Sequence, residues 1–240
     1  MAMKSYDPHK RNRLLAALRP VDFSRLAPKL EAVSLPQGEV LYEPGEDMKQ
    51  VYFPHNAMVS LLAVMREGQA IEIATVGRDG AVGAMSGLGL LRAFSRAVVQ
   101  VPGNASRIAA SRLQQAVAES TRLRDAIIRY NEAVLLQVQQ TAACNALHRI
   151  EGRLARWLLH TRDRTDSDEV PLTQEFLSQM LGVQRTTVNL ALRTLQGAGL
   201  IRPRRGRVEI LDRGKLEQMA CECYGIIRDQ IAQVLPEAQH

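Results

Sequence analysis

The sequence predicts an α+β chain that combines an N-terminal antiparallel β-roll, a long central helix and a C-terminal winged helix-turn-helix. Three patterns in the 240 residues carry this prediction. Short β-rich segments alternate with turn residues in the first part, helical spacing begins at Ser111, and two short helical segments with a basic hairpin follow Leu172. We therefore expect the chain to divide into residues 1–118, 119–145 and 146–240.

The first part predicts one helix followed by a β-roll. Asn12 to Leu30 carries apolar residues at helical spacing, whereas the later segments are short, rich in β-branched residues and separated by Pro and Gly. Many strands at such short spacing are typical of a barrel or jelly roll. The predicted strands are Val33–Leu35, Val40–Tyr42, Val51–Phe53, Met58–Met65, Ala70–Val76 and Ala97–Val101.

A long helix is predicted in the centre of the chain. Mostly apolar residues recur there at alternating steps of four and three, which is the heptad spacing of a coiled-coil seam. We interpret this seam as the interface of a homodimer, and the alternative is a helix that lies on its own barrel. The predicted dimerisation residues are Leu123, Ile127, Tyr130, Val134 and Thr141, with Gln137 in the same seam.

The segment after this helix keeps the helical spacing. Leu154, Trp157 and Leu158 are therefore expected in the core of the C-terminal domain, and residues 161–169 are expected to form a polar loop.

Residues 172–196 have the pattern of two helices across a tight turn. Thr173 can cap the first helix through its hydroxyl, and Gly182 stands where the chain must turn sharply. The second helix is predicted over Gln184 to Gln196, and Val183 is expected to fill the space between the two helices. The apolar face of the first helix is formed by Leu177, Met180 and Leu181.

The second predicted helix has an apolar side and a polar side. Its apolar stripe contains Val188, Ala191, Leu192 and Leu195. Its opposite face carries Arg185, Thr186, Asn189 and Arg193. A recognition helix in the DNA major groove needs this division, because one side packs on its own domain and the other reads base edges.

A basic β-hairpin is predicted after the second helix. Its arginines are Arg202, Arg204, Arg205 and Arg207. From Arg185 to Lys215 there are eight basic and two acidic residues, so the net charge of this stretch is +6, equal to that of the whole chain. Such a patch attracts phosphate, and together with the two helices it predicts DNA binding. The alternatives are a solvated basic face, or a helix-turn-helix that mainly contacts protein.

Other classes of function lack their usual patterns. The sequence has no phosphate-binding Gly-rich loop, no H-E-x-x-H and no nucleophile elbow. We therefore expect no enzyme. The alternative is a metal-dependent β-roll enzyme, although His55 is the one histidine in the barrel segment. The N-terminus has no apolar region typical of a signal peptide, and the apolar runs are too short to span a bilayer. We expect a cytoplasmic protein without a membrane partner.

The cysteines predict a reduced protein, because three of them cannot form a disulfide framework. Cys144 is expected to pack at the end of the central helix, and Cys221 and Cys223 form a C-x-C pattern near the C-terminus. A redox or metal-binding role is the alternative to an incidental one. A haem-ligand role for His55 is likewise the alternative to a structural one.

The order of these parts resembles the Crp/Fnr superfamily of bacterial transcription regulators. Residues 172–200 carry the resemblance through L-T, an apolar pair before Gly, and R-x-T-V, and residues 38–46 carry it through G-E-V-L followed by P-G-E. The resemblance implies that the β-roll is similar to a cyclic-nucleotide-binding jelly roll.

The resemblance also implies roles for single residues of the recognition helix. Arg185 stands where these regulators place a guanine-reading arginine, and Gln184 and Thr187 stand at phosphate-contacting positions. Thr186 replaces a common Glu, and Leu190 replaces a common Arg, so the operator is expected to differ from that of the cyclic-AMP receptors. The predicted DNA-binding residues are Thr173, Gln174, Gln184, Arg185, Thr186, Thr187, Asn189, Arg202, Arg204, Arg205 and Arg207.

An effector pocket follows from the same resemblance, at Gly83, Ala84, Ser95 and Arg96. Cyclic-nucleotide sensors of the family place a Glu at the position of Ala84 and an Arg at that of Ser95, so that Arg96 comes one position late. We expect either no effector or one other than cyclic AMP, with no cyclic nucleotide bound, and the alternative is a cyclic-nucleotide-responsive activator with an atypical pocket. A family Fe–S cluster needs about four Cys ligands. We therefore expect no cofactor and no metal.

These observations together predict a homodimeric transcription regulator. Its two recognition helices would enter successive major grooves of double-stranded DNA, on a palindromic operator with half-sites about 10 bp apart or a small multiple of that. RNA polymerase is a further partner that such a role would imply.

Overall fold

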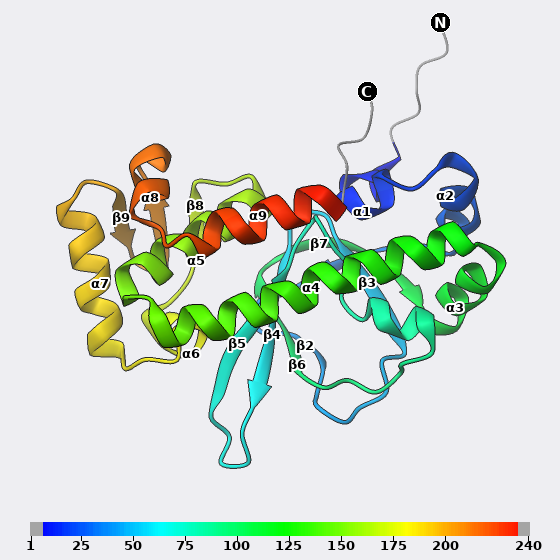
Figure 1. Cartoon of the computed structure of the whole chain (residues 1–240), viewed down its shortest axis with the longest axis horizontal. Coiled ribbons are helices and arrows are strands. Elements are labelled where there is room, and N and C mark those ends of the chain that lie inside the picture. Colours follow the sequence, from blue (N-terminus) through cyan, green and yellow to red (C-terminus); the bar gives the residue numbers. More distant parts are fainter. Residues whose placement is uncertain (1–6, 235–240) are drawn as a thin grey trace, which may run out of the picture.

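The computed structural model describes residues 7–234. A β-roll, a long helix and a C-terminal helical domain follow one another along the chain, as the sequence predicts (Figure 1). The expectation for the extreme N-terminus rests in part on residues 1–6, and these lie outside the described residues, as do residues 235–240.

The N-terminal segment forms several short helices. They are η1 (Pro8–Arg11), α1 (Arg13–Ala16), α2 (Pro20–Leu26) and η2 (Ala27–Lys29). The prediction of one continuous helix over Asn12 to Leu30 was therefore wrong, because the segment is helical but divided. Pro20 is the first residue of α2, where its missing N–H is tolerated, but the same residue disfavours a helical conformation at Arg19 before it.

Seven strands form the β-roll. They are β1 (Glu31–Leu35), β2 (Val40–Tyr42), β3 (Gln50–Pro54), β4 (Met58–Val64), β5 (Ala70–Val76), β6 (Arg96–Val101) and β7 (Gly103–Ala109). One antiparallel sheet has the order β1-β7-β3, and the other has the order β2-β6-β4-β5. The sequence prediction missed β7, because its first residues, Gly103 and Asn104, are typical of a turn. Strand β7 nevertheless pairs on both sides, with β1 and with β3.

The central helix α4 (Thr121–Leu147) follows η3 (Ala84–Leu88) and α3 (Ala110–Glu119). The Ser120 hydroxyl caps α4 by accepting a hydrogen bond from the Leu123 amide at 3.2 Å. Figure 1 shows α4 running along the molecule from α3, past the roll, to the C-terminal domain, with the last helix α9 (Cys223–Val234) lying beside it.

The C-terminal domain consists of α5 (Ile150–Thr165), β8 (Glu169–Pro171), α6 (Gln174–Leu181), α7 (Arg185–Gly197), β9 (Ile201–Arg204), β10 (Arg207–Ile210), α8 (Arg213–Met219) and α9. Its three strands form a small antiparallel sheet of order β8-β10-β9. The loop predicted at residues 161–169 was partly wrong, since α5 continues to Thr165. Arg164 is buried there because it pairs with Asp79 of the roll at 3.2 Å.

One apolar core joins the roll to the C-terminal domain. Met58 and Leu62 of β4 belong to the same buried cluster as Leu154 and Trp157 of α5 and Val188 of α7. The C-terminal domain is therefore docked on the roll by buried apolar surface, which stabilises one orientation of the recognition helix. Among the helices of residues 7–234, none is long and apolar enough to cross a membrane.

Candidate nucleic-acid interface

Helices α6 and α7 form the predicted helix-turn-helix. The hydroxyl of Thr173 accepts a hydrogen bond from the Phe176 amide at 3.2 Å, which confirms the predicted cap. Gly182 ends α6 in the left-handed conformation with φ of 62°, which confirms the predicted turn. Val183 is half-buried and packs against the shared core between the two helices.

The recognition helix α7 starts at Arg185 and ends at Gly197, one residue later at each end than predicted. Its whole predicted apolar stripe is buried and contacts α5 and α6. Figure 1 shows α7 at the end of the molecule opposite to α2 and α3, so its other side faces outward.

The outward side of α7 carries the side chains predicted to meet DNA. Gln184, Arg185 and Thr186 are exposed, and Thr187 and Asn189 are half-buried. Arg185 forms an ion pair with Glu175 of α6 at 2.5 Å, and both side chains are more than half exposed. Such an exposed pair contributes little to stability, so phosphate or a guanine base can replace Glu175 as the partner of the guanidinium.

Leu190 is the unusual member of this surface. Its side chain is 64% exposed, although a leucine gains free energy from burial. It lies on the outward side of α7 with Thr186, Asn189 and Arg193. An apolar side chain here suits contact with a thymine methyl group in the major groove.

The wing is the hairpin of β9 and β10. Gly206 closes its turn with φ of 75°, which glycine tolerates best. Its four arginines are exposed. Arg202 and Arg204 lie 3.2 and 4.0 Å from Glu209, and Arg207 lies 3.4 Å from Glu169. Thr173 and Gln174 are also exposed at the start of α6, so the predicted DNA-binding residues of both helices and the wing are accessible to a duplex.

The residues of the predicted effector pocket lie at η3 and at the start of β6. Gly83 precedes η3 in the left-handed conformation, and Ala84 is buried. Arg96 is held outside the apolar interior, because its Nε lies 3.0 and 2.9 Å from the two carboxylate oxygens of Glu43. Ser95 is half-buried beside it.

A buried tyrosine lies next to these residues in the roll. Tyr42 is buried in an apolar cluster with Ala97 and Val99, and its hydroxyl donates a hydrogen bond to the Gln50 carbonyl oxygen. A Cβ atom at Gly83 would lie 2.6 Å from that hydroxyl. The tyrosine ring therefore occupies the space beside the turn that carries Ala84.

The predicted dimerisation residues face their own chain. Leu123, Ile127 and Tyr130 are buried in one apolar cluster with the N-terminal helices and the roll, and Val134 packs against that cluster. Thr141 is buried as well. The assignment of this seam to a dimer interface is therefore corrected: its heptad spacing reflects packing of α4 on its own β-roll, which was the alternative.

A second stripe on α4 was missed. Ile128, Leu135, Val138 and Ala142 follow one another at steps of seven, three and four residues, on a different side of the helix from the buried seam, and Ile128 and Val138 are half-buried. Leu135 is 56% exposed and Ala142 is exposed. The signal was present in the sequence, but it competed with the stronger apolar seam of the inner face.

A buried carboxyl group between the roll and α5 was also missed. Glu72 of β5 accepts hydrogen bonds from the Ser60 hydroxyl at 2.7 Å and from Trp157 Nε1 at 3.1 Å. Burial is the largest influence on Glu72 and raises its pKa to about 7, although these donors act in the opposite direction. No pattern in the sequence distinguishes Glu72 from an exposed residue of an alternating strand.

His55 has a structural environment. Its Nε2 lies 2.7 Å from the Ser106 hydroxyl, and burial lowers its pKa to about 4. The ring is therefore neutral and engaged with β7, which supports the structural interpretation of this residue.

Comparison with known families identifies two domains in this chain. The model of the cyclic nucleotide-binding domain matches residues 32–120, and that of the Crp-like helix-turn-helix domain matches residues 152–219. No curated protein matches this chain.

Several solved structures share the fold of this chain. FixK2 from Bradyrhizobium japonicum has a TM-score of 0.67 at 16% identity, over 80% of this chain and 98% of its own. The c-di-GMP responsive global regulator CLP from Xanthomonas campestris has a TM-score of 0.63 at 18% identity, over 81% and 100%. A Crp/Fnr-family regulator from Thermus thermophilus has a TM-score of 0.61 at 22% identity, over 79% and 98%.

Proposed function

Because the chain belongs to the Crp/Fnr superfamily of DNA-binding transcription regulators, we propose that it acts as a homodimer. The dimer would bind a palindromic operator, and a cyclic nucleotide would not control this binding. The observation that carries the proposal is the outward side of α7 beside the wing. Exposed donors and acceptors lie there next to four exposed arginines. Base contacts from the helix would supply specificity, and phosphate contacts from the wing would supply affinity.

The base contacts follow from the chemistry of the exposed side chains. The guanidinium of Arg185 can donate two hydrogen bonds to O6 and N7 of guanine, and Asn189 can pair with adenine. Leu190 would favour a thymine methyl group. Because family members place an arginine at this position, the expected half-site departs from theirs by favouring thymine there.

The homodimer would form along the outer stripe of α4. Ile128, Leu135, Val138 and Ala142 have the spacing of a coiled-coil seam, and a second copy of α4 would cover them. Two chains paired in this way would present two copies of α7, which is what a palindrome requires.

Three features of the roll argue against a cyclic-nucleotide effector. Ala84 offers no carboxylate to a ribose, Arg96 is engaged by Glu43, and the buried Tyr42 lies beside the turn that carries Ala84. A second candidate, a cyclic-nucleotide-responsive activator, is favoured by the domain match over residues 32–120. The operator experiment distinguishes the two.

The test is a selection of DNA sites. Purified protein is incubated with a random duplex pool, with and without cyclic AMP or cyclic GMP, and the retained duplexes are sequenced. Palindromes enriched equally in all samples are the expected result. Enrichment that requires a cyclic nucleotide would establish the second candidate, and retained duplexes without a common sequence would contradict sequence-specific binding.

A further inference from the structure

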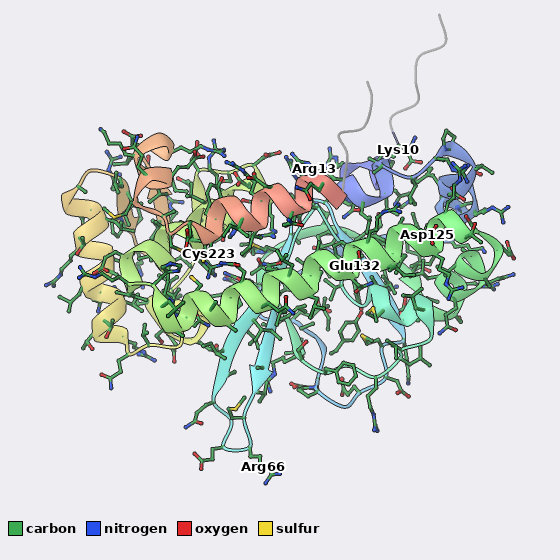
Figure 2. The ribbon with its side chains drawn as sticks, in the orientation of Figure 1. Lys10, Arg13, Arg66, Asp125, Glu132 and Cys223 are labelled. Carbon is green, nitrogen blue, oxygen red and sulfur yellow. The ribbon has the colours of Figure 1, made fainter. Side chains whose placement is uncertain are left out.

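Four side chains with metal-binding chemistry meet where α4 ends and α9 begins. Cys144 and His148 stand one helical turn apart at the end of α4, and Cys221 and Cys223 come from the C-x-C segment that starts α9. Their ligand atoms all lie within 4.8 Å of one another. Figure 2 labels Cys223 at the start of α9, beside the end of α4. The fold brings together residues that are more than 70 positions apart in the sequence.

The distances suit one tetrahedral ion. The Sγ atoms of Cys144 and Cys221 are 3.5 Å apart, and Cys223 Sγ lies 3.4 Å from His148 Nδ1. Zinc–sulfur bonds of about 2.3 Å and zinc–nitrogen bonds of about 2.0 Å at tetrahedral angles place two sulfurs about 3.8 Å apart and sulfur and nitrogen about 3.5 Å apart. Ligands spread over two iron atoms of a cluster would lie farther apart, so the set fits a single ion.

The groups around the four side chains also suit a metal site. Gln140 Nε2 donates to Cys223 Sγ at 3.1 Å, which stabilises a thiolate. Glu222 Oε1 lies 3.8 Å from His148 Nε2, whereas Cys223 lies near the other ring nitrogen, Nδ1. An acceptor at Nε2 would orient the ring so that Nδ1 points toward an ion. Arg153 and Arg156 carry positive charges that interact with Cys144. A site of three thiolates and one divalent ion has a net negative charge, and these two arginines would offset it.

We infer that Cys144, His148, Cys221 and Cys223 form a closed Cys3His site for one Zn²⁺ ion, which ties α9 to the joint between α4 and α5. Soft thiolate ligands in a four-coordinate set select zinc over magnesium or calcium. The expectation of no metal rested on three cysteines being too few for a cluster that needs about four, and it did not include His148 as a fourth ligand. Bound zinc would stabilise α9 against α4 and so the orientation of the DNA-binding domain.

The first experiment measures metal in the full chain. Untagged protein, because a polyhistidine tag binds the same ions, is purified under reducing conditions without chelator and its metals are quantified by mass spectrometry. One zinc ion per chain is expected. The metal-free protein is then titrated with Co²⁺, which should bind at one equivalent, give the visible bands of a tetrahedral thiolate site and raise the thermal unfolding midpoint.

The variants locate the ion. His148→Gln removes the partly exposed ligand with little change in volume, and it should weaken Co²⁺ binding by more than about 100-fold, beyond the 10- to 100-fold typical of a supporting residue. Glu222→Gln, which changes a neighbouring residue that is not a ligand, should keep one Co²⁺ per chain with at most such a supporting-residue loss.

Four results would overturn the inference. The first is a wild-type protein that binds no Co²⁺ although a thiol titration shows its three cysteines to be reduced. The second is bound iron with the visible absorption of a cluster, and the third is a Cys144–Cys221 disulfide in freshly purified protein. The fourth is full retention of the ion by the His148→Gln variant. The wild-type titration requires no variant, so a variant that fails to fold does not prevent the test.

Discussion

At the residue scale, Arg185 is the side chain that we propose to read a base. It begins α7, and its guanidinium is held in the exposed side of the domain by Glu175. We expect Arg185→Ala to weaken operator binding by about 1–3 kcal/mol and to relax preference at one base step, because a bidentate contact to guanine is lost. Equilibrium binding to the operator and to its single-base variants measures both effects.

The control for this prediction is Arg66→Ala. Arg66 lies in the exposed turn between β4 and β5, at the tip of the hairpin that projects from the roll (Figure 2). Its removal changes the net charge by the same amount but should leave base preference unaltered. If Arg185→Ala keeps the wild-type preference at every position, Arg185 does not read a base.

Glu72 predicts a pH dependence of stability. Its pKa is about 7 in the folded chain against an ordinary value of 4.5, so between these values the folded chain binds the additional proton. The free energy of unfolding should therefore fall as pH rises from about 4.5 to 7. Glu72→Gln should remove this part of the slope, because a glutamine does not titrate. Urea unfolding at a series of pH values measures it.

Glu67→Gln is the matched control for the pH experiment. Glu67 is exposed in the turn between β4 and β5, so the same chemical change there should leave the slope as in wild type. An equal slope in wild type and Glu72→Gln would show that another group titrates in this range.

At the scale of elements, α4 has two apolar sides. Its inner side is covered by its own roll, and we propose that a second chain covers its partly exposed outer stripe. Leu135→Asp should raise the dimer dissociation constant by more than about tenfold, because burying an unpaired carboxylate costs several kcal/mol. Sedimentation over a range of protein concentrations measures the effect, together with thermal unfolding to verify the fold.

Ala143→Asp is the control for the outer stripe. Ala143 is exposed on the same helix, to one side of the stripe, and a carboxylate there should leave the dimer intact. Ile127→Asp, by contrast, should unfold the chain, since Ile127 is 2% exposed within its own core. A Leu135→Asp protein that remains dimeric would place the interface on another element.

Single elements were predictable where local chemistry decides them. The cap of α6 by Thr173, the turn at Gly182 and the division of α7 follow from side chains within a few residues of one another. Strand β7 was not predicted, since it depends on pairing with β1 and β3. The break in the helix before Pro20 was not predicted either, because this single proline interrupts a segment whose apolar residues have helical spacing.

At the scale of the whole molecule, the roll and the DNA-binding domain meet at the turn before residue 81. Gly77 touches the stem of Arg164, and a Cβ atom there would lie 2.5 Å from Arg164 Cβ. Gly77→Ala should lower the free energy of unfolding by about 1–3 kcal/mol, because the overpacked turn pushes α5 away from the roll. Urea unfolding measures the change, and operator affinity reports the position of α7.

Gly225→Ala provides the comparison. Gly225 lies in α9 with open space around its Cα, so alanine should be neutral or stabilise by up to about 1 kcal/mol. Equal effects of the two substitutions would contradict a tight contact at Gly77.

The sequence by itself determined the class of the fold, the order of its parts and the exposed polar and basic face of α7 and the wing. These depend on periodicity, caps and local charge, which act over one or two turns of chain. Only the tertiary structure decided which side of α4 its own roll covers, that Glu72 is buried against Trp157, and that Cys144 and His148 meet Cys221 and Cys223. Those outcomes depend on contacts between residues far apart in the chain. The periodicity of a sequence indicates that one face of a helix is apolar, but it does not indicate which part of the protein covers that face.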